Sequence, residues 1–362
     1  MSNARKLADN LPTEGSLSGR NMVINGAMNI AQRSSSETGL GASSGYFMCD
    51  RWRMGVSSSG RLTMSQSSDA PDGFNNSLKL QCTTADTSID AGEYMLLQQL
   101  FEGQDLQRIG KGTSSAKKIT VSFYVKGNGN ATYMCELWDN DNNRHATQQF
   151  SVTSSWTRVV LTFNSDTTGA LDDDSNLSLY LNFWLHAGST FGGGSYTANT
   201  WASNVNANRA VGASSFFSST SNTFQITGVQ MEVGSQASPF EHEPVGVTLS
   251  KCQRYLQMLI RHTENDDQQI GSYFSSSRAF ICVPHKVSMR ATPTISVVGS
   301  VAGTMYSNNG AITTTTLSST YARKDSSGLD FTPSSSAGAG NAFHFDWTQT
   351  SSAHYIKAEA EL

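Results

Sequence analysis

The chain has 362 residues, of which 37% are hydrophobic, so it is long enough to form two domains with buried cores. Only 15% of the residues are charged and the net charge is −4, which leaves no clustered Lys and Arg for a phosphate backbone. No run of eighteen apolar residues occurs. We therefore expect neither nucleic acid as a partner nor membrane insertion.

The N-terminal residues predict a short helix. Ala4, Leu7 and Ala8 share one side of a helix over residues 4–10, and Pro12 with the glycines at 15 and 19 ends it. A helix of this length is not stable alone. We expect residues 1–21 to form an attachment segment that packs on another protein, and a frayed terminus is the open alternative.

From about residue 60, apolar and polar residues alternate with the period of a strand that has one buried face. This alternation occurs at Leu62 and Met64, Leu78 and Leu80, residues 119–125, 133–137, 159–163 and 177–185. Clusters of Gly, Asn, Asp and Pro separate these runs, and no long amphipathic helix intervenes. The pattern predicts an all-β fold, an antiparallel β-sandwich.

A closing strand of this sandwich is predicted at residues 224–233. Apolar residues alternate there, and the alternation shifts phase at Gly228, which predicts a β-bulge. Gly234 and Pro239 then end the strand.

The next segment changes to helical spacing. Apolar positions at 249, 252, 255, 256, 259 and 260 predict a linker at residues 244–262 that is mainly helical. Residues 263–362 contain strand-like runs at 278–284, 294–298 and 341–347, whereas residues 318–335 look too polar to bury much. We expect a second, smaller C-terminal β domain that needs support from subunit contacts.

No motif predicts catalysis, a metal centre or a cofactor. The seven histidines lack zinc spacing, and the GxSxG match at residues 41–45 lacks its flanking strand and helix. Asp139 to Asn143 resembles the first half of a calcium loop, but Arg144 and Phe150 stand where that loop needs Gly and Glu. A hairpin turn is therefore the preferred interpretation, and a calcium site elsewhere stays open.

The five cysteines are scattered, odd in number and without CxxC spacing. Four of them lie in apolar patterns, which predicts buried, reduced thiols. Reduced thiols are consistent with assembly in a reducing cytoplasm.

One face of the strand at residues 177–185 is a candidate carbohydrate-binding surface. If its leucines and Phe183 face the core, the alternate positions Tyr180, Asn182, Trp184 and His186 face the other way. Aromatic faces stack on pyranose rings, and amide and imidazole groups bind hydroxyls. The same alternation adds Tyr124 and Trp138 to the candidates, together with Lys126 and Glu136. The open alternative is that another subunit or the C-terminal domain covers this face.

Six segments of the chain carry a resemblance to a known family. Residues 20–33, 46–53 and 224–243 resemble the opening and closing segments of the carbohydrate-binding-module-like jelly rolls of bacteriophage tail and capsid fibres. Residues 252–255, 287–295 and 358–362 resemble the linker and C-terminal domains of the same fibre proteins. The resemblance implies a jelly roll at residues 22–243, a linker at 244–262 and a C-terminal β domain at 263–362.

The same resemblance implies a function. The chain resembles a non-catalytic tail fibre subunit of the virion, a homotrimer that contacts host-surface glycan and is assembled in the host bacterial cytoplasm. Two alternatives stay open, namely a capsid-decorating head fibre or cement protein with a structural role and a tailspike-type glycan hydrolase. The absence of an internal repeat disfavours the hydrolase.

Overall fold

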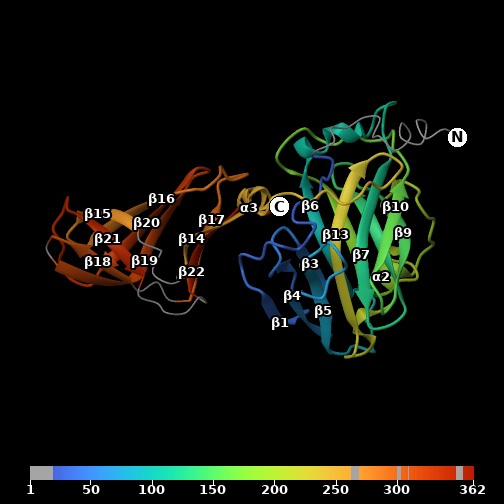
Figure 1. The fold of residues 1–362 in the computed structure, drawn as a ribbon, viewed down its shortest axis with the longest axis horizontal. Coiled ribbons are helices and arrows are strands. Elements are labelled where there is room, and N and C mark those ends of the chain that lie inside the picture. The colour runs from blue at the N-terminus through green and yellow to red at the C-terminus, as the bar shows by residue number, and fades with distance from the viewer. Residues whose placement is uncertain (1–18, 262–268, 300–302, 309, 348–353) are drawn as a thin grey trace. The chain divides into compact units, whose positions relative to one another are not determined.

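The structure, a computed structural model, describes residues 19–261, 269–299, 303–308, 310–347 and 354–362 (Figure 1). These residues are mostly antiparallel β-strands and form two compact units, one of which ends at Thr248 and includes Leu362, while the other runs from Leu249 to Glu361. The predicted all-β fold, a sandwich followed by a smaller β domain, is confirmed. The helix predicted at residues 4–10 lies outside the described residues.

The first unit is a sandwich of two antiparallel sheets. The six-stranded sheet has the order β1 (Ser36–Leu40), β4 (Arg61–Ser67), β5 (Ser77–Thr84), β13 (Thr223–Val233), β7 (Ile119–Gly127) and β10 (Thr157–Phe163). The seven-stranded sheet has the order β12 (Ala202–Ser203), β9 (Arg144–Val152), β8 (Ala131–Asp139), β11 (Leu177–Ala187), β6 (Tyr94–Glu102), β3 (Arg53–Ser57) and β2 (Gly45–Tyr46). Short helical turns connect them at η1 (Gly103–Asp105), η2 (Gln107–Ile109), α2 (Ser189–Gly192), η3 (Asn206–Asn208) and η4 (Phe216–Ser218).

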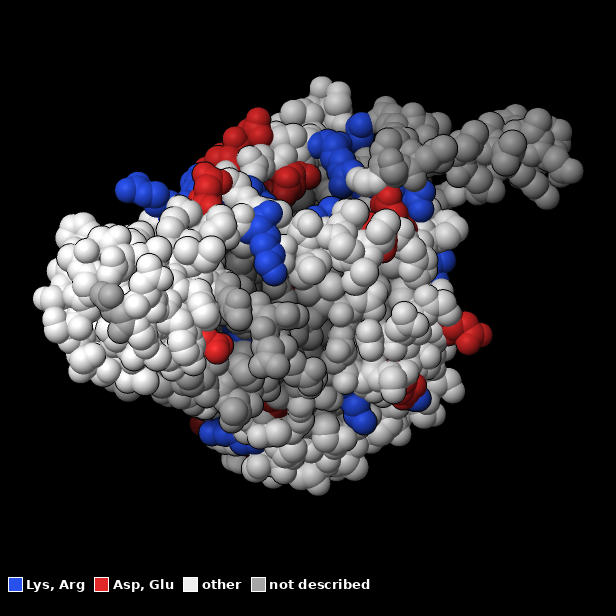
Figure 2. All heavy atoms as spheres, turned by 60° about the vertical axis from the view of Figure 1, so that its left-hand side comes forward, with Lys and Arg blue, Asp and Glu red and all other residues white. Residues whose placement is uncertain are grey.

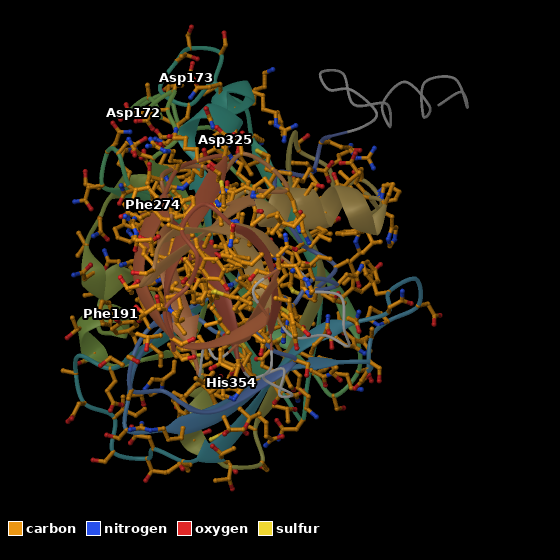
Figure 3. The ribbon with its side chains drawn as sticks, turned by 90° about the vertical axis from the view of Figure 1, so that its left-hand side faces the viewer. Asp172, Asp173, Phe191, Phe274, Asp325 and His354 are labelled. Atoms are coloured by element: carbon orange, nitrogen blue, oxygen red, sulfur yellow. The ribbon has the colours of Figure 1, made fainter. Side chains whose placement is uncertain are left out.

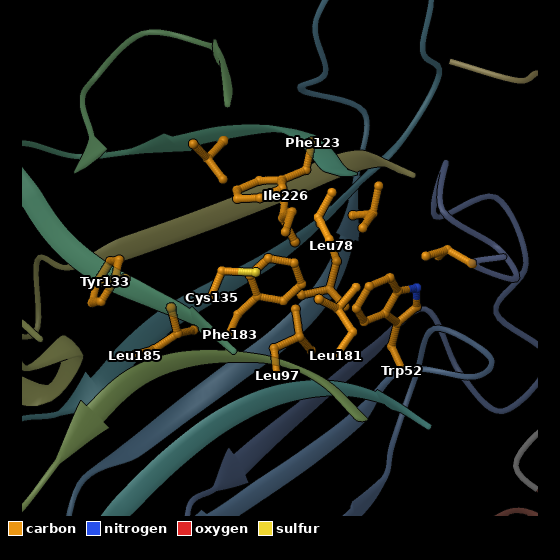
Figure 4. Packing of buried hydrophobic residues seen from close by; sticks show 14 of the residues in the cluster. Trp52, Leu78, Leu97, Phe123, Tyr133, Cys135, Leu181, Phe183, Leu185 and Ile226 are labelled. Atoms are coloured by element: carbon orange, nitrogen blue, oxygen red, sulfur yellow. The ribbon is translucent and has the colours of Figure 1, made fainter. Parts of the chain in front are cut away.

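The core of the sandwich lies between the two sheets (Figure 4). Phe123 of β7 meets Phe183 of β11 edge to face, with ring centroids 5.0 Å apart, and Phe150 of β9 packs on both rings. Leu181 and Leu185 point into the same core as Phe183. The alternation predicted for β11 is therefore confirmed, and each such buried side chain contributes about 1.5–3 kcal/mol.

The opening and closing segments of the sandwich are bonded to each other. The Asn21 side chain accepts a hydrogen bond from the Met231 backbone N–H at 3.0 Å and donates one to the Val229 carbonyl. The Asn21 backbone N–H donates to the Glu241 carboxylate at 2.8 Å. Gly228 has φ 60°, and the pairing of β13 with β7 shifts register around it, so the predicted bulge is confirmed. The two motifs close one domain.

The second unit begins within α3 (Val245–Gln253) and contains a small sheet and a barrel. The three-stranded sheet has the order β14 (Leu256–Arg261), β22 (Tyr355–Glu359) and β17 (Thr294–Val298). The closed barrel has the order β15 (Gln269–Ser275), β16 (Arg278–Pro284), β20 (Ser326–Pro333), β19 (Gly310–Ala322), β18 (Gly303–Ser307) and β21 (Ala342–Trp347).

Two details of this unit correct the sequence prediction. The predicted helical linker at residues 244–262 is helical only as far as Gln253, and residues 256–261 instead form a strand that pairs with β22. Residues 318–335, expected to bury little, supply parts of β19 and β20, where Leu329 and Phe331 are buried. A closed barrel tolerates polar side chains on its outer wall, so a polar run can still form its strands.

Charged side chains are sparse on the surface. Figure 2 shows a largely uncharged face on which several Lys, Arg, Asp and Glu side chains lie near one another in the upper part of the view and few lie elsewhere, in agreement with the 15% of charged residues. Among the described residues no helix is long and apolar enough to cross a membrane.

Candidate functional site

The outer face of the seven-stranded sheet brings together most of the predicted site residues. Tyr180 of β11 lies opposite Trp138 of β8, and Asn182 lies opposite Glu136 of β8 and Gln98 of β6. Cross-strand neighbours on one face are close enough for their side chains to touch. The alternation that separates this face from the core is therefore confirmed.

Three of the predicted residues are enclosed, which corrects their expected exposure. Asn182, Trp184 and His186 are at most 1% exposed. Residues 188–213, here named the covering segment, fold over this end of the face, and Phe191 of α2 lies 5.3 Å from the Trp184 ring. The cover that the structure shows over these side chains comes from the same domain.

Tyr124 lies elsewhere, which corrects its expected place beside Tyr180. It belongs to β7 of the six-stranded sheet, and because Phe123 points into the core, Tyr124 points to the opposite outer side of the sandwich. There it packs against Phe74, with ring centroids 5.4 Å apart. Lys126, on the same strand and face, pairs with Asp69 at 2.8 Å.

A buried charge network underlies the face. The Glu136 carboxylate is fully buried and accepts hydrogen bonds from Asn182 Nδ2 at 2.8 Å, Trp184 Nε1 at 2.9 Å and the Arg209 guanidinium, with both contacts at 2.8 Å. His145 Nδ1 lies 3.1 Å away. Burial alone raises the pKa of Glu136, but the Arg209 charge and the hydrogen bonds from His145 and Arg209 outweigh it and lower the pKa to about 2.

Arg209 joins the covering segment to the sheet. Its guanidinium lies 4.4 Å from the Trp138 ring centroid and 4.9 Å from that of Trp184, in addition to its paired contact with Glu136. An arginine can bind a carboxylate with its fork and an aromatic ring with its face, so one side chain fixes both.

Tyr180 and Trp138 form the part of the face that stays half-buried, here named the aromatic platform. Their rings stack with centroids 4.8 Å apart and an angle of 19°. Arg53 of β3 is also half-buried and donates to Gln98 Oε1 at 2.5 Å, while Gln98 donates to Asn182 at 2.8 Å. The polar groups around the platform are thus held in place by the network below it.

His186 belongs to a separate buried cluster at the covered end. Its Nε2 lies 3.3 Å from the Glu93 carboxylate, and its Nδ1 lies 2.9 Å from the Ser215 hydroxyl. Burial lowers the pKa of His186, against the opposing effect of Glu93 and Asp86. The cluster ties the strand end to its loops and is closed to a ligand of sugar size.

The predicted hairpin at Asp139 to Asn143 is confirmed as the turn between β8 and β9. Lys111 fills an oxygen-lined site beside it. Its ammonium lies 2.5 Å from Asp139 Oδ2, 3.1 Å from Asp166 Oδ2 and 2.9 Å from both the Thr168 and Gly169 carbonyls. Two carboxylates and two carbonyls are the donors of a calcium site, and here a lysine supplies the positive charge. Within the part of the chain that the structure describes, no cluster of three His, Cys, Asp or Glu side chains is arranged to hold a metal ion.

Sequence reasoning missed Arg209, Arg53 and Glu93. Arg209 lies in a segment without periodicity, so no pattern connects it to Glu136. Arg53 reaches Gln98 through the pairing of β3 with β6. Glu93 lies directly before β6 and reaches His186 through the pairing of β6 with β11, and strand pairing is a property of the sheet.

No family model and no curated protein matches the chain. Among solved structures it is similar to the enzymatically active domain of tailspike protein 4 of bacteriophage CBA120, with 13% identity, 59% of this chain and 21% of that chain covered, and a TM-score of 0.30. It is also similar to a family 61 carbohydrate-binding module in complex with β-1,4-galactotriose (10% identity, 59% and 99% covered, TM-score 0.30). A family 11 carbohydrate-binding module from Clostridium thermocellum, in complex with a mixed-linked tetrasaccharide, aligns at 14% identity over 58% of this chain and 99% of that one, with a TM-score of 0.27. The chain thus spans about a fifth of the tailspike structure and nearly the whole of each module.

Proposed function

We propose that this chain is a non-catalytic fibre subunit of a bacteriophage virion and that its sandwich domain contacts a glycan on the host surface. The virion assignment is supported by the resemblance of residues 20–33 and 224–243 to phage fibre jelly rolls. Those two segments are bonded to each other at Asn21 and Met231, so the motif has a structural reason to recur in such a fold.

The aromatic platform is the observation that carries the glycan contact. Tyr180 and Trp138 present half-buried rings on the outer face of the sheet, and the half-buried Arg53 guanidinium supplies hydrogen-bond donors beside them. A pyranose offers C–H faces to rings and hydroxyls to donors. Because the network on Glu136 fixes the surrounding groups, little side-chain freedom is lost on binding.

The test is glycan binding by the full chain and matched variants. Tyr180→Ala removes a ring contact worth about 0.5–1.5 kcal/mol, so binding to a bacterial surface-polysaccharide array should weaken up to about tenfold per site. Tyr180→Phe keeps the ring and should bind like the parent. Tyr124→Ala removes a ring on the opposite outer side and serves as the control. If Tyr180→Ala binds every glycan as the parent does, the platform is not the contact surface.

Assembly completes the proposal. A homotrimer carrying three weak sites gains affinity by effective concentration, without any stronger individual contact. Residues 1–21 would attach the fibre to other virion proteins after assembly in the host bacterial cytoplasm. A head fibre or cement protein would incorporate into particles in the same way but would show no platform-dependent glycan binding, so the array experiment separates the two.

A further inference from the structure

A second surface with binding chemistry lies on the outer wall of the C-terminal barrel. Outward positions of β16, β19 and β20 and the end of β15 enclose an open groove of about 460 Å³. Its floor is Gly328, which pairs with Cys282 on β16 and Tyr321 on β19. A glycine inside a strand weakens the ladder and often marks a place where another group approaches the backbone. A Cβ at this position would lie 2.7 Å from the Phe280 ring, so a larger residue would close the groove.

Two aromatic rings stand exposed at the groove. Phe274, which Figure 3 labels, is 70% exposed, and Tyr321 is 50% exposed. The Tyr321 ring lies 6.3 Å from the Phe280 ring, so its position is set by packing. Exposed rings around a concave surface provide the apolar faces on which a pyranose stacks.

The positive charges at the groove are of two kinds. Arg278 is compensated, because its Nε and Nη2 donate to Asp330 Oδ2 at 2.9 and 2.6 Å, and Nη2 also donates to the Tyr321 hydroxyl at 3.0 Å. Its guanidinium also lies 4.8 Å from the Phe274 ring centroid. Arg323 lines the same groove and is exposed, and it forms no ion pair with the described acidic residues. The groove therefore carries one uncompensated positive charge beside its exposed rings.

We infer that this groove binds an acidic saccharide, with the carboxylate on Arg323 and the sugar ring on Phe274 and Tyr321. An apolar segment of a second subunit fits less well, because it would cover the Arg323 charge without supplying a partner. A neutral sugar would leave the same charge unused. The site lies in a different unit from the aromatic platform and does not depend on it.

Chemical modification of Cys282 can report whether a ligand occupies the groove. It lines the groove and is exposed, whereas Cys49, Cys82, Cys135 and Cys252 are buried. N-ethylmaleimide should therefore modify the native full chain at Cys282 first, which intact mass and peptide mapping would show. Trigalacturonate at about ten times its Kd should slow this modification about tenfold, since only the free fraction reacts. The fully methyl-esterified trisaccharide has the same rings without the charges and should protect less than twofold.

Matched variants separate the charge from the rings and from the other site. Arg323→Gln should abolish protection by trigalacturonate, Arg323→Lys should keep part of it, and Tyr180→Ala in the sandwich should leave it unchanged. Arg323 is exposed, so neither substitution should disturb folding. No protection at millimolar trigalacturonate, or equal protection by the methyl ester, would overturn the inference. Modification that slows with rising protein concentration and no sugar would also overturn it, because the groove would then be a subunit contact.

Discussion

Replacing Trp184 by alanine tests whether the covering segment encloses the sheet face in solution. The Trp184 ring is 1% exposed, and its Nε1 donates to Glu136 at 2.9 Å. Truncation therefore removes packing against Phe191 and Arg209, opens a cavity and leaves Glu136 with one donor fewer. A buried Trp→Ala change costs about 3–5 kcal/mol. In a unit of this size, each kcal/mol lowers the melting temperature by roughly 2–4 °C, so a drop of roughly 6–20 °C is expected.

The assay is differential scanning calorimetry of the full chain, since removing a tryptophan alters fluorescence by itself. Tyr180→Ala is the matched control, because the half-buried platform ring should cost less than about 1.5 kcal/mol, within the range of ordinary surface and boundary substitutions. Trp184→Phe keeps much of the ring volume but not the donor, so its difference from the parent is dominated by the lost hydrogen bond to buried Glu136, about 1–3 kcal/mol.

An unchanged melting temperature in Trp184→Ala would refute this reasoning. It would mean that residues 188–213 do not lie on the ring in solution, and Trp184 would return to the candidate glycan contacts. If the melting temperature drops in Trp184→Ala and is unchanged in Tyr180→Ala, Trp184 belongs to the scaffold and Tyr180 to the surface.

Two further predictions concern buried charge. The pKa of Glu136 is lowered from 4.5 to about 2, so its stabilising contribution is complete above about pH 4.5 and is lost as the pH falls toward 2. In the parent, the free energy of unfolding from urea curves should fall by about 3 kcal/mol between pH 4.5 and pH 2 because of Glu136, and Glu136→Gln should lack this part of the fall. The same fall in the parent and in Glu136→Gln would contradict the network. Lys111→Met leaves two carboxylates facing each other and should cost about 3–5 kcal/mol. Lys111→Ala leaves more room between the carboxylates, so millimolar calcium chloride should restore part of the free energy of unfolding that this variant loses. Equal stability of the parent and Lys111→Met would show that the ammonium does not hold this site.

Strand periodicity predicted the inner and outer faces of β11 correctly, because alternation follows directly from backbone geometry. It did not predict that Asn182, Trp184 and His186 are enclosed. The segment that covers Trp184 is rich in Gly, Ser and Asn and has no period, so its sequence around residues 192–195 indicated only a turn. Burial of an outer face depends on where such a segment folds back, and only the tertiary structure shows this.

The misplacement of Tyr124 has a related cause. A period of two tells which residues share a side of their own strand, but it does not tell which of two sheets the strand joins. Tyr124 and Tyr180 both point away from the core, yet they do so on opposite outer sides of the sandwich. The prediction that residues of several strands share one face is therefore correct for strands of one sheet, as for Tyr180 and Trp138. It is wrong for strands of different sheets, as for Tyr180 and Tyr124.

The two candidate surfaces use the same chemical arrangement at different depths. In the sandwich, Arg209 is bound by fully buried Glu136 and lies against Trp138. In the barrel, Arg278 is bound by Asp330 and lies against Phe274, with its side chain 38% exposed. Loss of one partner of a fully buried pair leaves an uncompensated buried charge and strongly destabilises the fold. The sandwich pair therefore belongs to the scaffold beneath a surface. The barrel pair instead joins the buried Asp330 carboxylate to a guanidinium that reaches the surface, and Arg323 remains the uncompensated positive charge of that groove.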